Sequence, residues 1–317
     1  MGVIAIYKRL IIIGNGFDLF HGIKSTYKDF QNFVYQNASK EFIESIEKYI
    51  LPEELWNQFE KALGDLEYEE LLDYHSDSLV SYGVDNWSDS YHHDYQYLVD
   101  SDLAFSKDIS QYLSKWINSI DTDVERRLKR NYLTPNSLYL CFNYTDTLEN
   151  VYGIERGQIL YLHGKAMENT NLIVGHGNKS LFQNNNIPDN LSEEDYEQFM
   201  INMDFGDVRV NEAEDIIKGY FRTTYKDVES LISINDDFFR SLGRIQEVFV
   251  LGHSLSDIDM PYFEVIKNMV PNNCNWIVSY YKGEWVHHQQ QLLNLGIFPT
   301  KMSFIDMKQL TVKKYMK

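Results

Sequence analysis

The sequence predicts an α/β fold: a doubly wound, Rossmann-like and mostly parallel sheet that carries a helical insertion. Two observations support this fold class. Short apolar runs of the kind that form buried parallel strands recur along the chain, and segments with helical spacing lie between several of them. In addition, two of the runs end directly at a glycine, as strands do where a tight turn leads into a helix.

Six segments are predicted to be strands, and the first and fourth are the clearest. The β-branched run 10–13 stops at Gly14, and the run 247–251 stops at Gly252. The full set of predicted strands is 10–13, 137–142, 158–162, 247–251, 275–281 and 301–305. Helices are predicted at 27–35, 260–269 and 284–295, where apolar residues recur at helical spacing.

Two long stretches interrupt this alternation and define the predicted domains. Residues 40–130 are rich in Glu, Asp, Tyr, Leu and Trp with helical patterning, and we interpret them as a helical insertion or subdomain. Residues 1–39 and 131–317 then form the nucleotide-binding core. That core carries its own inserted acidic helical region at about 167–244.

Composition limits the classes of function. With 29 basic and 47 acidic residues, the 317-residue chain has a net charge of −18, which disfavours binding to nucleic acid or to a membrane surface. A 44% hydrophobic content excludes disorder over most of the chain. The two cysteines, Cys141 and Cys274, exclude a disulfide framework or an all-cysteine zinc site. Without a signal-peptide pattern or a run of about 18 apolar residues, a cytoplasmic location is expected.

The first candidate site is the turn after the first strand, Gly14-Asn15-Gly16-Phe17-Asp18. Glycines between a strand and a helix let backbone N–H groups approach a phosphate, and the helix dipole favours the anion. Leu19 occupies the position of the third glycine in the full dinucleotide pattern. The alternative is a plain strand-to-helix turn.

The second candidate is Asn143, which directly follows the predicted strand 137–142. The carboxyl ends of parallel strands line the ligand crevice of such sheets, and an amide there can orient a ribose hydroxyl or an attacking water. The alternative is that Asn143 or one of the nearby threonines caps the next helix.

Histidines follow three strand-like runs: His163, His176 and His253. Histidine suits proton transfer near neutral pH, although a single histidine is more often structural. No HxH or HExxH spacing occurs, so no metal is expected. The segment Gly252-His253-Ser254 suits phosphate or ribose contacts, and Asp257 is expected to cap the helix that begins near Met260.

Together and in this order, the motifs resemble the AbiH family of bacteriophage abortive-infection proteins. The resemblance covers residues 10 to about 265, and the segments between motifs carry little of it. The matching motifs are 12–19, His21-Gly22, 27–30, 142–149, 162–164, 252–259 and Tyr262-Phe263.

AbiH motifs are in turn similar to a divergent sirtuin-type NAD-binding core. This resemblance implies that Asn143 and His163 are catalytic and that NAD is the ligand. It further implies that the chain is an anti-phage effector, an NAD glycohydrolase that yields nicotinamide and ADP-ribose. The residues implied to bind NAD are Gly14, Asn15, Gly16, Phe17, Asp18, Tyr27, Gly252, His253 and Ser254.

The chain departs from the sirtuin pattern in ways that limit what carries over. Asn15 and Asp18 replace an alanine and a serine, and Tyr27 stands where a pocket-wall residue is expected. The four cysteines of the sirtuin zinc module are absent, which favours NAD cleavage over deacetylation. The alternative function is a non-catalytic module that senses NAD or ADP-ribose. Control by a homo-oligomer or by a phage-derived trigger is expected if the chain cleaves NAD.

Overall fold

The computed structural model describes residues 7–85, 87–129, 132–168, 172–183, 192 and 207–311. A six-stranded, fully parallel sheet confirms the predicted doubly wound α/β fold. Its order is β3-β2-β1-β4-β5-β6. Each predicted strand is present, with its ends shifted by at most one residue. The strands are β1 Arg9–Ile13, β2 Ser137–Cys141, β3 Ile159–Tyr161, β4 Glu247–Leu251, β5 Asn275–Tyr280 and β6 Met302–Asp306.

The strand order creates a switch point beside β1. Ile13, the last residue of β1, is in register with Cys141 of β2 on one side and Leu251 of β4 on the other. The chain runs outward from β1 through β2 to β3, then returns to place β4 on the opposite side of β1. In open parallel sheets, ligands bind outside the carboxyl ends of the strands where the order reverses. Here that point lies between the ends of β1 and β4.

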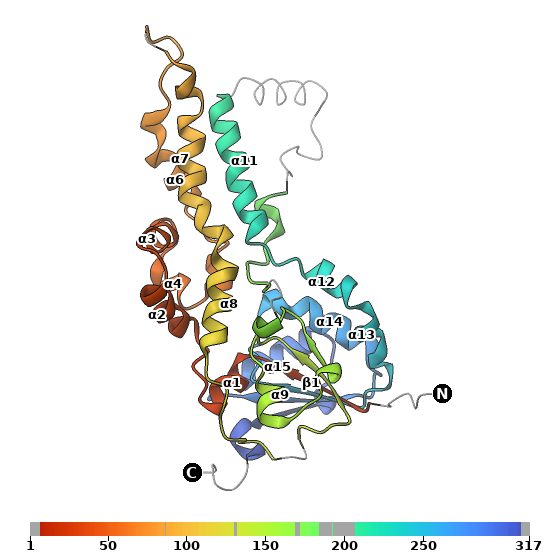
Figure 1. Ribbon diagram of the computed structural model, residues 1–317. Coiled ribbons are helices and arrows are strands. Elements are labelled where there is room, and N and C mark those ends of the chain that lie inside the picture. Colours follow the sequence, from red (N-terminus) through yellow and green to blue (C-terminus); the bar gives the residue numbers. More distant parts are fainter. Residues whose placement is uncertain are drawn as a thin grey trace, which may run out of the picture. The chain divides into compact units, whose positions relative to one another are not determined.

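Alternate residues of the strands build two apolar layers. Leu10 and Ile12 belong to one layer, and Ile11 and Ile13 belong to the other, because successive side chains of a strand point to opposite faces. Figure 1 shows the flanking helices. The first layer includes residues of α12 Val228–Ile234, α13 Asp236–Arg240, α14 Met260–Met269 and α15 Trp285–Asn294. The second includes residues of α1 Asn15–His21 and α9 Thr147–Tyr152.

The chain divides into two compact units. The sheet unit comprises Met1–Phe30, Leu113–Ile173 and Asp227–Lys317, and the helical unit comprises Gln31–Tyr112 and Val174–Lys226. The two stretches that we interpreted as separate insertions thus contribute to one unit. Within the acidic region at 167–244, residues 169–171, 184–191 and 193–206 lie outside the described residues.

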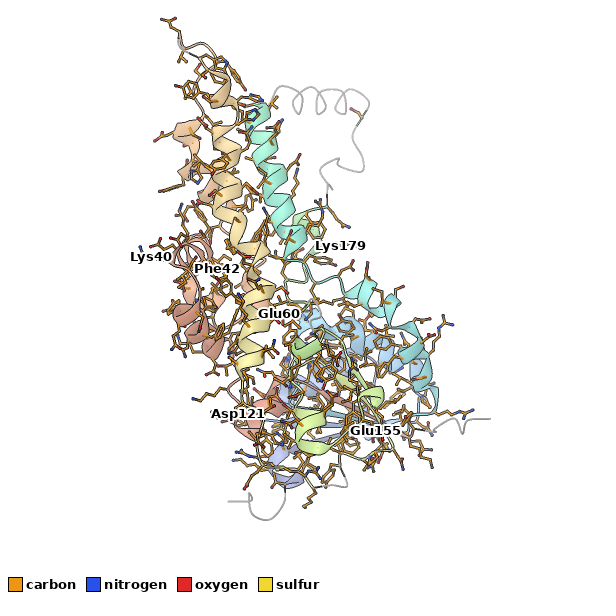
Figure 2. The ribbon with its side chains drawn as sticks, viewed as in Figure 1. Lys40, Phe42, Glu60, Asp121, Glu155 and Lys179 are labelled. Carbon is orange, nitrogen blue, oxygen red and sulfur yellow. The ribbon has the colours of Figure 1, made fainter. Side chains whose placement is uncertain are left out.

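Helices make up the regular structure described for the helical unit, and α7 Asp94–Leu103 and α11 Val208–Thr223 lie side by side (Figure 1). This unit also contains a buried ion pair: Lys226 Nζ, on a residue only 1% exposed, lies 2.7 Å from Glu60 Oε2 (Glu60 is labelled in Figure 2). No described helix is both long and apolar enough to cross a bilayer. The helices outside the sheet unit's layers are α2 Tyr27–Asn37, α3 Lys40–Lys48, α4 Pro52–Leu55, α5 Phe59–Ala62, α6 Tyr68–Tyr74, α7 Asp94–Leu103, α8 Ile109–Ser119 and α11 Val208–Thr223.

Candidate functional site

The turn after β1 is bound to the loop after β4 by backbone hydrogen bonds. The Gly14 N–H donates to the Leu251 carbonyl at 3.0 Å, and the Gly16 N–H donates to the Gly252 carbonyl at 2.7 Å. The Phe17 N–H donates to the Gly14 carbonyl at 2.9 Å. Three of the N–H groups expected to hold a phosphate therefore have acceptors inside the chain.

Close backbone approach explains the glycines of this turn. A Cβ atom on Gly14 would lie 2.6 Å from the Gly252 oxygen, and a Cβ on Gly252 would lie 2.1 Å from the Phe17 nitrogen. Gly252 also has φ +67°, in the left-handed region that favours glycine. These glycines let the two segments meet at the switch point.

Asp18 lies in α1, at the end of this turn, and is almost completely buried, at 1% exposure. Its Oδ2 accepts a hydrogen bond from the Thr145 hydroxyl at 2.6 Å, and the Thr147 hydroxyl donates to Thr145 at 3.1 Å. Its other oxygen, Oδ1, is buried and makes no hydrogen bond in the part of the chain that the structure describes. Burial raises the pKa of Asp18 to about 6, although hydrogen bonding from Thr145 acts in the opposite direction.

Asn143 joins the same cluster from the end of β2. Its Nδ2 donates to the Gly14 carbonyl at 3.2 Å, and the side chain is 6% exposed. The capping alternative does not apply to Asn143, because α9 begins at Thr147 with Asp146 in the cap position. The structure thus brings the first and second candidate motifs into contact.

His163 lies in an aromatic cluster at the ends of β2 and β3. It is 3% exposed, and its ring centroid is 5.4 Å from that of Phe142 and 6.1 Å from that of Tyr262. Phe142 and Tyr262 belong to the apolar layer of Leu10 and Ile12. Ring contacts with this cluster hold His163 in position, whereas the hydrogen bond to Gly14 holds Asn143.

His253 contacts the same aromatic cluster from the loop after β4, with its ring centroid 4.4 Å from that of Phe142. Its Nδ1 accepts a hydrogen bond from the Leu255 N–H at 2.9 Å, so its neutral ring carries the proton on Nε2. Nε2 lies 3.5 Å from Asp259 Oδ2, which also accepts a hydrogen bond from Ser256. Leu255 is fully buried with φ +55°, a strained backbone conformation that places its N–H at His253.

The comparison with protein families decides the relationship of the chain to known proteins. Residues 10–280 match the model of the family described as bacteriophage abortive infection AbiH. The chain belongs to the AbiH family. The family description gives it a role in bacteriophage abortive infection, and every candidate motif lies inside the matched range. A search of curated proteins found no match.

Three other residues were predicted to bind NAD, and all three are at least partly exposed to solvent. Ser254 is exposed in the loop after β4, and Tyr27 is half-buried at the start of α2. Asn15 is exposed, and its side-chain amide exchanges hydrogen bonds with Ser25. The prediction that Asp257 caps α14 is wrong, because its carboxylate accepts a hydrogen bond from Gln291 and Asp259 occupies the cap position.

His176 follows no strand of the sheet, so grouping it with the strand-end histidines was wrong. It belongs to the helical unit of this AbiH protein, where its Nε2 contacts the Phe221 carbonyl at 2.9 Å. Its backbone forms only an isolated bridge, with Tyr225. Apolar residues before a histidine are therefore a weak strand signal. Across the described ranges, no group of three or more His, Cys, Asp and Glu side chains is arranged to hold a metal ion.

Sequence reasoning missed Thr145 and Thr147 as partners of Asp18. A signal for them was present, because both follow Asn143 within four residues and the ends of neighbouring strands meet at one edge. The sequence did not reveal that the Asp18 side chain, on α1, is directed toward these threonines in the interior of the protein.

Proposed function

We propose that this AbiH family member binds a nucleotide at the carboxyl edge of its sheet, at the switch point between β1 and β4, and cleaves NAD there to nicotinamide and ADP-ribose. The observation that supports this best is the hydrogen bond from the Asn143 amide to the Gly14 carbonyl. It joins the ends of β1 and β2 at the edge where doubly wound sheets bind their ligands.

Cleavage requires breaking the bond between C1′ of the ribose and the nicotinamide nitrogen. Both electrons of that bond pass to the ring, so nicotinamide leaves neutral and positive charge develops on the ribose. A water oxygen then bonds to C1′ and loses one proton. In this proposal Asn143 orients the water or a ribose hydroxyl, and His163 accepts or stabilises a hydroxyl proton. The buried Asp18 carboxylate, in its ionised form, favours the developing positive charge.

The glycine turn has a specific part in this proposal. Its N–H groups at Gly14, Gly16 and Phe17 already have acceptors within the chain. Holding a pyrophosphate with the Gly16 N–H would therefore require its hydrogen bond to Gly252 to open. The turn and the residues Gly252, His253 and Ser254 would then border the nucleotide on either side of the switch point.

The proposal is tested by incubating the purified protein with NAD and measuring nicotinamide release by chromatography. Asn143→Ala and His163→Ala are expected to reduce turnover by 100-fold or more, on the order of a lost general acid–base or orienting group. The matched controls are Asn273→Ala and His287→Ala, which change exposed residues away from these motifs. Equal turnover in the wild type and both site variants would show that the two residues do not have these roles.

A second candidate is a module that binds NAD or ADP-ribose without cleaving it. The observation in its favour is that Asn143 and His163 are only 6% and 3% exposed, and contacts within the protein hold both. Calorimetry with each nucleotide distinguishes the two functions. Micromolar binding without nicotinamide release, also in the presence of phage components, would support the binding module.

A further inference from the structure

The segment between α6 and α7 exposes a group of large apolar side chains beyond the amino end of α7 (Figure 1). The Tyr82 ring is 4.8 Å from the Trp87 ring, which is 5.7 Å from the Tyr91 ring, measured between centroids. Tyr82 is 52% exposed, Val84 is 36% exposed, and Val208 at the start of α11 is 52% exposed. We call these five residues the aromatic tip. Apolar side chains that are exposed together, rather than singly, are typical of a surface that binds another molecule.

A buried arginine holds the aromatic tip in position. Arg209 is 2% exposed, and its Nη1 donates to the Val80 carbonyl at 2.9 Å. Its guanidinium lies 4.4 Å from the centre of the Tyr82 ring and 5.7 Å from that of Trp87. Both carboxylate oxygens of Asp207 accept hydrogen bonds from Arg209, so its charge is neutralised. The exposed rings therefore have a fixed support, and a surface that is already ordered loses less entropy when it binds a partner.

The sequence that contributes most of the aromatic tip is strongly acidic. Between Lys61 and Lys107 the chain contains no lysine or arginine. Asp77, Asp85 and Asp94 from this stretch are all exposed. The acidic residues of the stretch are Asp65, Glu67, Glu69, Glu70, Asp73, Asp77, Asp85, Asp89, Asp94, Asp100 and Asp102. A surface with this charge repels nucleic acid and anionic lipid, and it attracts cationic groups.

The helical unit already binds two of its own cations with the same two kinds of group. Lys48 Nζ lies 2.8 Å from Asp102 Oδ2 and 4.0 Å from the centre of the Tyr74 ring. Arg209 likewise combines a carboxylate with the face of an aromatic ring. Such pairs stabilise a cation by charge and by the electrons of the ring. The aromatic tip offers both groups to an outside cation, since the exposed Asp85 is two residues from Trp87.

We propose that the aromatic tip is a docking surface for a basic segment of a partner protein. Arginine or lysine side chains of that segment pair with the exposed carboxylates, and its apolar side chains pack on Tyr82, Trp87 and Val208. Aromatic residues of this kind contribute much of the binding energy in protein interfaces. A second copy of the chain fits less well, because its net charge is −18 and its own tip is acidic. This inference is independent of the proposed function, since the tip belongs to the helical unit and the candidate site to the sheet unit.

The test measures binding of the full chain to a fluorescein-labelled peptide of alternating arginine and leucine, by fluorescence anisotropy. The wild type is expected to bind this peptide, and to bind a peptide with glutamate in place of arginine about 10-fold more weakly or worse. Added salt should weaken binding of the basic peptide, because ions screen the attraction between exposed charges. Failure to bind the basic peptide, or equal binding of both peptides, would overturn the proposal.

Two variants locate the binding surface. Tyr82→Ala is expected to weaken binding of the basic peptide about 10-fold, because it removes an apolar contact. Asp85→Lys changes an exposed side chain and should weaken binding about threefold or more through like charge. The matched controls are Tyr281→Ala and Glu155→Lys, at exposed residues of the sheet unit, and circular dichroism checks that each variant is folded. Equal affinities in the tip and control variants would show that the peptide binds elsewhere.

Analytical ultracentrifugation without the peptide tests a second copy as the occupant. The wild type and Tyr82→Ala are expected to sediment alike, because neither is expected to associate through the aromatic tip. A dimer that forms in the wild type and is lost in Tyr82→Ala would show that the tip binds another copy of the chain, and it would overturn the proposal.

Discussion

The carbonyl oxygen of Gly252 accepts a hydrogen bond from the N–H of Gly16 at 2.7 Å. The two glycines follow different strands, β1 and β4, which are neighbours in the sheet but far apart in the sequence. Space is so limited at this contact that neither position tolerates a Cβ atom without a shift of the backbone. The switch point of the sheet is therefore a packed joint between two loops.

Gly252→Ala is expected to destabilise the protein by more than about 3 kcal/mol, because its Cβ would lie 2.1 Å from the Phe17 nitrogen. Gly153→Ala is the matched control. Gly153 has the same φ of +67° but no atom near its Cβ position, so that variant should lose only about 1–2 kcal/mol. Urea unfolding measures both. Similar losses would mean that backbone conformation, and not the packed joint, determines the need for glycine at 252.

Asp18→Asn is expected to stabilise the protein more at pH 7 than at pH 4. The pKa of Asp18 is raised from 3.8 to about 6 in the folded state, so the folded state holds its proton more tightly than the unfolded state. Stability is thus unaffected by this group below pH 3.8, falls as pH rises toward 6, and is lower by about 3 kcal/mol above it. Asparagine does not titrate. The difference in unfolding free energy between variant and wild type, measured from pH 4 to 7, should change by about that amount, and a constant difference would contradict the prediction.

Tyr152→Phe is expected to cost about 1–3 kcal/mol, since it leaves two buried groups without a partner. The Tyr152 hydroxyl donates to His21 Nε2 at 2.5 Å and accepts from the Leu128 N–H at 3.1 Å. His21 cannot compensate by protonation at neutral pH, because burial lowers its pKa to about 4. Tyr281→Phe, at a residue 62% exposed, is the control and should be neutral in the same thermal unfolding measurement.

Arg209→Lys is expected to destabilise the helical unit by about 2 kcal/mol, because an ammonium cannot reproduce the planar arrangement of guanidinium donors. Arg209 is 2% exposed and binds both carboxylate oxygens of Asp207, the Val80 carbonyl and, at 4.4 Å, the face of the Tyr82 ring. Arg240→Lys changes an exposed arginine and should have little effect. Comparable melting temperatures for the two variants would show that the planar guanidinium of Arg209 is not required for the stability of the helical unit.

The strands were predictable because each is a short run buried on both faces, for which an unbroken apolar sequence is the expected pattern. The helix 260–269 was predicted with the bounds that the structure gives, and 284–295 within one residue at each end. The unit boundaries were harder to predict, because helical patterning continues through α2 and α8 although the division between units falls inside both.

The candidate site was predictable as a set of strand ends, but its contacts were not. Sequence order shows that Gly14, Asn143 and Gly252 follow strands, and the parallel sheet then brings them to one edge. The direction of each side chain depends on three-dimensional packing. Asp18 faces inward to Thr145, and His163 turns into the aromatic cluster beside Phe142, for reasons that no local pattern encodes.

The central position of β1 has a consequence for the synthesis of the protein. β1 precedes both of its neighbours in the sheet along the chain, and these begin only at Ser137 and Glu247. A ribosome must therefore reach β4 before β1 can pair on both sides, and contacts of such long range fold slowly. The joint between Gly16 and Gly252 cannot exist in any chain that stops before β4. The candidate site thus forms only after β4 has been made.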